Sequence, residues 1–293
     1  MPSALDLLAS EFLEHRGSGR FGRPIRFLRR VSSTQDTLRE WILAEEIPEG
    51  AVVVAEEQTA GRGRQSRKWW SRPGAALTFS LLLRPAFATG GAGALDPANP
   101  SSQVDPAGGR DGKAVERSAL ARAAVPSGLG VLSLAAGVAV REAVSCGGLK
   151  WPNDLLAPDG RKLAGILIET SGVGGGKPVV LLGVGLNVHA PAPAGGAALE
   201  EFVPVPSRGA LLGRLLESLE RWCRRRREDP AAVVGAWNEV NVVLGRQVRI
   251  RLSGEEFTGR ALRLNPAGAL VVEHRGSERT VTAGEVELLR VVD

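Results

Sequence analysis

The 293-residue chain lacks several features that would mark a specialised class of protein. Its two cysteines, Cys146 and Cys223, are too few for a disulfide framework or a cysteine zinc site. We expect two reduced core thiols in a cytoplasmic protein. No apolar run approaches the roughly 18 residues of a spanning helix, so we expect no membrane segment. The first residues, MPSALDLLASEFLEHRG, have no basic segment ahead of an apolar one and do not predict a signal peptide.

Aromatic side chains are also scarce, at 4% of the chain, and tyrosine is absent. Proteins that bind single-stranded nucleic acid stack bases on exposed aromatics in series, and most aromatics here lie in apolar patterns. A pI near 9.8 keeps an RNA- or single-stranded-DNA-binding protein as an alternative. The net charge is only +5, however, so composition gives this alternative little support.

What is present is the pattern of an α+β protein. Residues 86–127 are rich in Gly, Ala, Pro and Ser without periodicity, which predicts a mobile low-complexity insertion. From residue 241, short alternating segments broken by turn residues predict a small antiparallel β-barrel or meander. We therefore expect a domain over 1–240, on a mixed or antiparallel sheet, and a second over 241–293. Apolar patterns predict helices over 31–46, 132–144 and 208–229, and strands over 51–58, 76–85, 149–156, 161–170 and 178–189.

The stretch AEEQTAGRGRQSRKWW, residues 55–70, concentrates glycine and arginine after an apolar strand. It is one glycine short of a dinucleotide fingerprint, and no helical pattern follows to receive a pyrophosphate. The chain also contains no Gly-Lys-Ser/Thr sequence of a P-loop. What remains is a glycine loop whose guanidinium groups suit a phosphate or a carboxylate. By itself, the stretch fits a solvated basic loop equally well.

Two later segments favour the anion site. In KWPNDLL, Lys150 stands at a strand edge beside a Trp-Pro turn, where a half-buried ammonium group needs an anion. In RKLAGILIE, Gly165 lies in mid-strand, where a missing side chain permits close approach of a ligand or another backbone. Taken alone, a surface lysine and a β-bulge are the simpler interpretations.

Taken together, SSTQ, EQTAGRGRQSRKWWS, LTFSLLLRP, KWPNDLL, KLAGILIE and GVGLNV closely resemble the biotin protein ligases, also called biotin–[acetyl-CoA-carboxylase] ligases. The resemblance runs from about Arg26 to the C-terminus, apart from the insertion. It implies an α+β catalytic domain of the class II aminoacyl-tRNA synthetase type and an SH3-like C-terminal domain. Only about twenty residues precede it, so we expect the monofunctional type without an N-terminal DNA-binding domain. Gln35 replaces the usual asparagine and Ser66 the usual loop glycine.

The resemblance implies that biotin and Mg-ATP form biotinyl-5′-AMP, after which biotin passes to one lysine of a biotin carboxyl carrier protein, a subunit of acetyl-CoA carboxylase. Mg²⁺ would be held through the ATP phosphates, with no metal site of the protein's own. A homodimer stays open, and no DNA partner is expected. The alternatives are a lipoate or octanoate ligase of the same superfamily, a nucleic-acid-binding protein, and a biotin-binding module without catalysis.

The resemblance also implies roles for individual residues. Lys150 and Arg64 would be catalytic, with Asp154 orienting the acceptor amine. Ser33, Thr34 and Gln58 would bind the biotin ureido head. The full biotin set is Ser33, Thr34, Gln35, Gln58, Gly61, Arg62, Gly63, Arg64, Lys150 and Gly165. The full ATP and adenylate set is Arg62, Arg64, Arg67, Lys68, Trp69, Lys150, Asn153 and Asn187.

Overall fold

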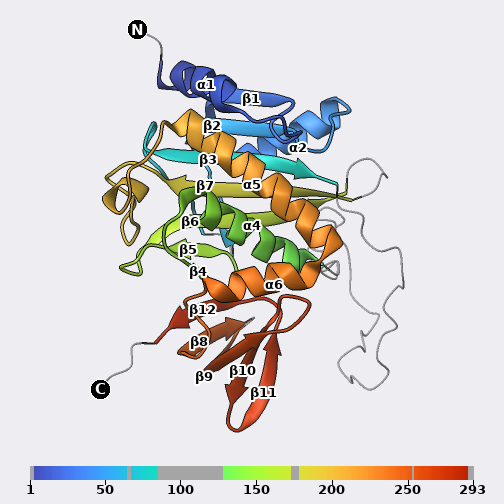
Figure 1. The fold of residues 1–293 in the computed structure, drawn as a ribbon, viewed down its shortest axis with the longest axis vertical. Helices are drawn as coiled ribbons and strands as arrows, with labels where there is room; N and C mark the ends of the chain where they lie inside the picture. The colour runs from blue at the N-terminus through green and yellow to red at the C-terminus, as the bar shows by residue number, and fades with distance from the viewer. Residues whose placement is uncertain (1–2, 65–66, 85–127, 173–177, 253, 290–293) are drawn as a thin grey trace, which may run out of the picture.

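The computed structural model describes residues 3–64, 67–84, 128–172, 178–252 and 254–289, and it contains two sheets (Figure 1). Ser66 and the predicted insertion at 86–127 lie outside the described residues. No helix in the described ranges is long and apolar enough to cross a membrane. Cys146 and Cys223 are both free and buried, as predicted.

The larger sheet has seven strands in the order β1-β2-β3-β7-β6-β5-β4. β1 and β2 are parallel, whereas the other neighbouring strands are antiparallel, which confirms the predicted mixed sheet. The central strands β3 and β7 are buried along most of their length, which explains their continuous apolar sequences. The strands are β1 (Ile25–Val31), β2 (Val52–Gln58), β3 (Ala76–Leu83), β4 (Gly148–Lys150), β5 (Asp154–Leu156), β6 (Lys162–Ser171) and β7 (Val179–Asn187).

Helices cover both faces of this sheet. Val52 and Val54 of β2 point into the main core, whereas Val53 points to a second core beneath α2, because strand side chains alternate. In α2, Leu38 and Trp41 supply the apolar stripe that covers this second face. The other face is covered by α1, α4, α5 and α6 (Figure 1). The helices are α1 (Ala4–His15), α2 (Thr34–Ala44), α4 (Leu129–Val144), α5 (Arg208–Glu228) and α6 (Pro230–Glu239), with a 3₁₀ turn η3 (Leu199–Glu201).

The C-terminal sheet has five antiparallel strands in the order β11-β10-β9-β8-β12. The predicted small antiparallel domain is found, and no ladder joins β11 to β12 within the described segments, so of the two predicted forms it has that of a meander. Its apolar side chains belong to the same core cluster as the larger sheet, and Trp151 Nε1 donates to the Gly268 carbonyl at 3.0 Å. The boundary at 240/241 stays a prediction. The strands are β8 (Gln247–Leu252), β9 (Glu255–Leu264), β10 (Leu270–His274), β11 (Ser277–Val281) and β12 (Glu285–Leu288).

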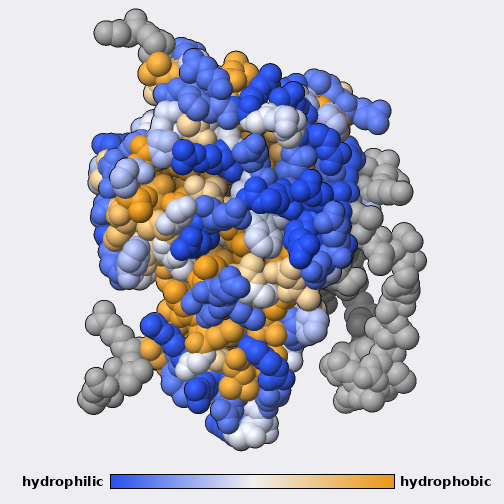
Figure 2. All heavy atoms as spheres, viewed as in Figure 1, coloured by the Kyte–Doolittle hydropathy of each residue, from blue (hydrophilic) through white to orange (hydrophobic). Residues whose placement is uncertain are grey.

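The predicted elements are found, with one correction. The run 149–156 is not one strand, because Trp151 and Pro152 form a turn that separates β4 from β5. The end of α5, which carries the run Arg224–Arg227, is largely solvated, and its surface is hydrophilic in Figure 2. Arg225 and Arg227 pair with Asp229 and Glu49, so part of this basic charge is balanced within the chain.

Candidate active site

A cavity of about 620 Å³ lies where the two sheets meet the glycine–arginine loop. Its wall includes the N-terminus of α2, the strands β3, β6 and β7, and the edge of the C-terminal sheet at β8 and β12. Gly61 is the predicted site residue that is not part of this wall, as far as the described residues show. The predicted residues that line it are Ser33, Thr34, Gln35, Gln58, Arg62, Gly63, Arg64, Arg67, Lys68, Trp69, Lys150, Asn153, Asp154, Gly165 and Asn187.

One part of the wall carries neutral hydrogen-bonding groups. The backbone N–H and hydroxyl of Thr34 donate to Gln58 Oε1 at 2.8 and 3.1 Å. The Thr34 hydroxyl also lies 2.8 Å from Ser80 Oγ, and Ser33 is buried beside it at the N-cap of α2. Ser80, which the sequence did not indicate, comes from the buried strand β3. Buried hydroxyl and amide groups of this kind suit an uncharged polar ligand group.

Gln35 does not occupy the open part of the cavity. Its Nε2 donates to the carbonyls of Leu167 and Leu181, each at 3.1 Å, and so joins β6 to β7. Gly183 makes room for this amide, since a Cβ there would lie 3.2 Å from the Gln35 side chain. Gln35, which is longer than the asparagine usual at this position, thus links β6 to β7 beneath the hydroxyl and amide groups of the wall.

A second part of the wall carries cations around one carboxylate. Asp154 Oδ1 accepts from Lys162 Nζ at 2.6 Å, and Lys150 Nζ lies 3.6 Å from Asp154 Oδ2. The half-buried Lys150 therefore has the anion that its sequence position required, and Asp154 is only 13% exposed. Lys162, at the start of β6, is a site residue that the sequence analysis missed.

Arg64 reaches the same region from the loop. Its Nη1 donates to Asn153 Oδ1 at 3.4 Å, and Asn153 Nδ2 donates to the Ile166 carbonyl at 2.8 Å. No carboxylate of the described chain lies within ion-pair distance of Arg64, and burial lowers the pKa of its guanidinium. An arginine stays protonated in any case, so Arg64 presents a charge to whatever enters the cavity.

The loop itself folds back like a hairpin. Arg62 and Lys68 form an antiparallel bridge, Gly63 N–H donates to the Arg67 carbonyl at 2.7 Å, and Trp69 N–H donates to the Gly61 carbonyl at 2.9 Å. Gly61 must lack a side chain, because a Cβ would lie 2.5 Å from the Trp69 carbonyl oxygen. Gly61 therefore shapes the base of the loop.

The indole of Trp69 lies against two glycines. Gly165 and Gly185 are opposite each other on β6 and β7. A Cβ at Gly185 would lie 2.3 Å from Trp69 Cε2, and one at Gly165 would lie 3.4 Å from Cζ3. The space at Gly165, predicted to admit a ligand or another backbone, is approached here by two side chains, this ring and Lys162. Trp69 Nε1 is buried and has no partner among the described residues.

Two further groups reach the cavity from distant segments. Asn187, at the end of β7, donates weakly from Nδ2 to the Lys162 carbonyl at 3.3 Å, while its buried Oδ1 has no partner in the described chain. Arg67 pairs with Glu285 of β12, so the loop touches the C-terminal sheet. Arg249 of β8 also lines the cavity on that side.

Comparison with known proteins gives the family to which the chain belongs. Residues 27–91 match the Biotin/lipoate A/B protein ligase family, and residues 243–289 match the Biotin protein ligase C terminal domain. The biotin–[acetyl-CoA-carboxylase] ligase of Mycobacterium tuberculosis (strain ATCC 25618 / H37Rv) is 33% identical over 256 residues, which cover 83% of this chain and 80% of the relative. The protein of that name from Paracoccus denitrificans is 31% identical over 254 residues, 83% of this chain and 92% of the relative.

A solved structure is similar over nearly the whole chain. The biotin protein ligase from Aquifex aeolicus in complex with biotin and ATP has a TM-score of 0.68 and 25% identity, and the alignment covers 91% of this chain and 98% of that one. The fold and the family match at residues 27–91 define the broader class of biotin and lipoate protein ligases. Within it, the chain belongs to the biotin–[acetyl-CoA-carboxylase] ligase family. The predicted family, fold class and ligase activity are thereby confirmed.

Proposed function

We propose that this protein joins biotin to ATP as biotinyl-5′-AMP and then transfers biotin to a lysine of a biotin carboxyl carrier protein. The observation that carries the proposal is the order of groups along β6. Gln35 contacts the Leu167 carbonyl, whereas Asp154 pairs with Gly165 and the ammonium group of Lys162 lies beside that glycine. The neutral and the charged groups therefore follow one another along the strand, which suits an elongated ligand with a neutral head and a carboxylate.

The cationic part would serve the first reaction. A biotin carboxylate oxygen forms a bond to the α-phosphorus of ATP, and the bond from that phosphorus to pyrophosphate breaks. Two anions must approach each other, and negative charge builds on the α-phosphate oxygens. Lys162, Lys150 and Arg64 converge on this region and would stabilise that charge most in the transition state. Asp154 holds the two ammonium groups in place.

Mg²⁺ would enter with ATP. The described residues contain no group of three or more His, Cys, Asp or Glu side chains that could enclose an ion. The donor set fits an ion held mainly by phosphate oxygens, to which the unpartnered Oδ1 of Asn187 could add one oxygen ligand. Bound there, the ion would supply charge neutralisation at the phosphates.

The second reaction needs an acceptor amine without its proton. The acceptor ammonium group first loses a proton to water, and the resulting amine attacks the acyl carbon of biotinyl-AMP. The bond from that carbon to the phosphate oxygen breaks, AMP leaves, and the second proton of the new amide nitrogen passes to solvent. We propose that Asp154 orients the acceptor nitrogen as it arrives, before it loses its proton, in place of Lys150, whose 3.6 Å contact is the longer of the two. Asp154→Asn would then slow transfer from preformed biotinyl-AMP, and unchanged transfer by this variant refutes the role.

Adenylate formation separates the biotin activity from its alternatives. Tritiated biotin or lipoate is supplied with Mg-ATP, and the nucleotide products are resolved. We expect biotinyl-AMP from the wild type and a large loss in Lys162→Gln. The matched control is Arg161→Gln, because Arg161 is adjacent but pairs with Asp159 and Glu201. Lipoyl-AMP as the sole product would favour the lipoate alternative, and neither product would refute the proposal.

We further propose that the protein acts in the cytoplasm and does not bind operator DNA. Much of the exposed basic charge is already paired, for example Arg263 with Glu278 and Arg279 with Glu255. Paired charges release few counterions on binding nucleic acid. A titration with duplex DNA and with single-stranded RNA at 50 and 200 mM salt tests this, and tight binding at the higher salt contradicts it.

A further inference from the structure

We infer that Asp36, Arg39 and Glu169 form a clamp that holds Arg62 and so positions the glycine–arginine loop over the cavity. We call these three residues the loop clamp. The inference rests on the proposed function, because its consequence is retention of the acyl-adenylate. It gives Arg62 a positioning role, in contrast to the ligand contact that the family resemblance implies for this residue.

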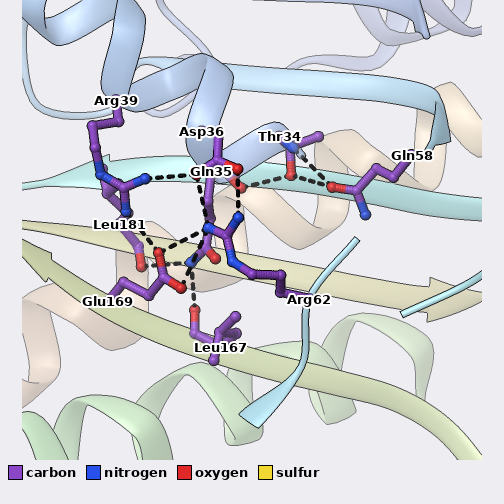
Figure 3. A network of polar contacts seen from close by, with 10 residues as sticks. Thr34, Gln35, Asp36, Arg39, Gln58, Arg62, Leu167, Glu169 and Leu181 are labelled. Carbon is purple, nitrogen blue, oxygen red and sulfur yellow. Dashed lines mark hydrogen bonds and ion pairs between the residues drawn. The ribbon is translucent and has the colours of Figure 1, made fainter. Parts of the chain in front are cut away.

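The geometry is that of alternating charges around a ring (Figure 3). Arg62 Nη1 and Nη2 donate to the two oxygens of Asp36, with the Nη2 contact at 2.9 Å, and Nη2 also lies 3.3 Å from Glu169 Oε2. Arg39 closes the ring, with 2.7 Å from its nitrogens to each of Asp36 Oδ1 and Glu169 Oε2. Two guanidinium groups and two carboxylates thus compensate each other's charge.

The four side chains come from three separate segments. Asp36 and Arg39 belong to α2, Glu169 to β6 and Arg62 to the loop. Each is between one quarter and one third exposed, so their pairing is partly shielded from solvent. A forked guanidinium held by two carboxylates has little rotational freedom. The clamp therefore fixes the loop to the same helix that presents Thr34 to the cavity.

Arg62 and Arg64 then have different roles although they are two residues apart. Arg62 donates to two carboxylates of the protein, and its charge is neutralised there. Arg64 contacts only the neutral Asn153 oxygen among the described side chains. A ligand phosphate can bind Arg64 without breaking an ion pair, whereas binding Arg62 would require it to leave Asp36. The structure thus assigns anchoring to Arg62 and anion binding to Arg64.

The loop can be tested without a substrate. Trypsin cleaves after Arg62, Arg64, Arg67 and Lys68, and it requires the loop to leave the cavity wall. We expect Glu169→Gln and Asp36→Asn to raise the rate of cleavage in residues 62–68 by about three- to tenfold. The matched control is Glu278→Gln, which removes an equivalent Arg–carboxylate pair in the C-terminal sheet, at Arg263. Its loop cleavage should equal that of the wild type.

Release of biotinyl-AMP from the preformed complex gives the second readout. The two clamp variants should release it about three- to tenfold faster, while the maximal rate of adenylate formation changes less than twofold. General destabilisation would not speed release while leaving the maximal rate of adenylate formation unchanged. Arg62→Lys keeps the charge but loses the two-pronged guanidinium contact, so its release rate should lie between those of the wild type and the clamp variants. If either variant fails to fold, the other still tests the clamp. The inference is overturned if the folded variants are cleaved in the loop and release biotinyl-AMP at the same rates as the wild type. If the wild type itself makes no biotinyl-AMP, the proposed function is refuted instead.

Discussion

The contact between Trp69 and Gly185 leads to a prediction whose size follows from the structure. In Gly185→Ala the new Cβ would lie 2.3 Å from Trp69 Cε2 and 2.4 Å from Cζ2. Carbon atoms pack at about 3.5–4.0 Å, so the indole must move by more than about 1 Å. Its backbone is held by the hydrogen bond to Gly61, and the sheet beneath is buried, so neither side yields readily. Overpacking of this kind costs about 1–3 kcal/mol.

We expect this cost to fall on ligand binding more than on folding, because the loop can leave the sheet while the rest of the fold stays intact. The affinity for biotinyl-AMP, measured by calorimetry, should fall by about five- to 150-fold. Gly172→Ala is the matched control, since a Cβ there would have no neighbour within 4 Å among the described residues. Combining Gly185→Ala with Trp69→Ala removes the clash, so the double variant should bind as Trp69→Ala alone does. Wild-type affinity in Gly185→Ala, or fully additive losses in the double variant, would refute this reasoning.

Three further outcomes follow from buried and paired groups. Glu56→Gln should lower the free energy of unfolding in urea by about 3–5 kcal/mol, because it leaves Arg208, paired with Glu56 at 2.7 Å, as a buried charge without its carboxylate. The hydrogen bond from Arg62 lowers the pKa of Asp36, so this carboxylate stabilises the fold above about pH 4 and the contribution is lost as the pH falls through the folded pKa. In thermal melts from about pH 5 to pH 3, the melting temperature of Asp36→Asn should therefore fall less with decreasing pH than that of the wild type. Burial raises the pKa of the Cys223 thiol to about 12, so iodoacetamide at neutral pH should alkylate it in urea but not in the native protein.

The sequence predicts the fold where a periodic pattern decides it. The continuous apolar runs of β3 and β7 and the stripe of α2 are determined by local burial, and each appears as expected. Helix α1 was missed although its signal is local, since Ser3 and Asp6 form a capping box at its start.

The site was less predictable because its pairs join distant segments. Lys162 follows Arg161 at the start of a strand and resembles a surface residue in the sequence. Only the β5–β6 pairing, with its irregularity near Leu156, brings it beside Asp154. The same holds for Glu169, which meets Arg62 across 107 residues of chain. Neither the periodicity of the sequence nor a motif predicts which strand residues are paired, because the pairing is set only when the sheet is assembled.

Mass spectrometry of an intact acceptor gives the most direct test of the central claim. A biotin carboxyl carrier domain is incubated with the wild-type protein, biotin and Mg-ATP, alongside Lys162→Gln and the Arg161→Gln control. We expect the carrier to gain the mass of one biotinyl group with the wild type and the control, and far less with Lys162→Gln. A carrier whose mass is unchanged after incubation with the folded wild type and both substrates would contradict the account.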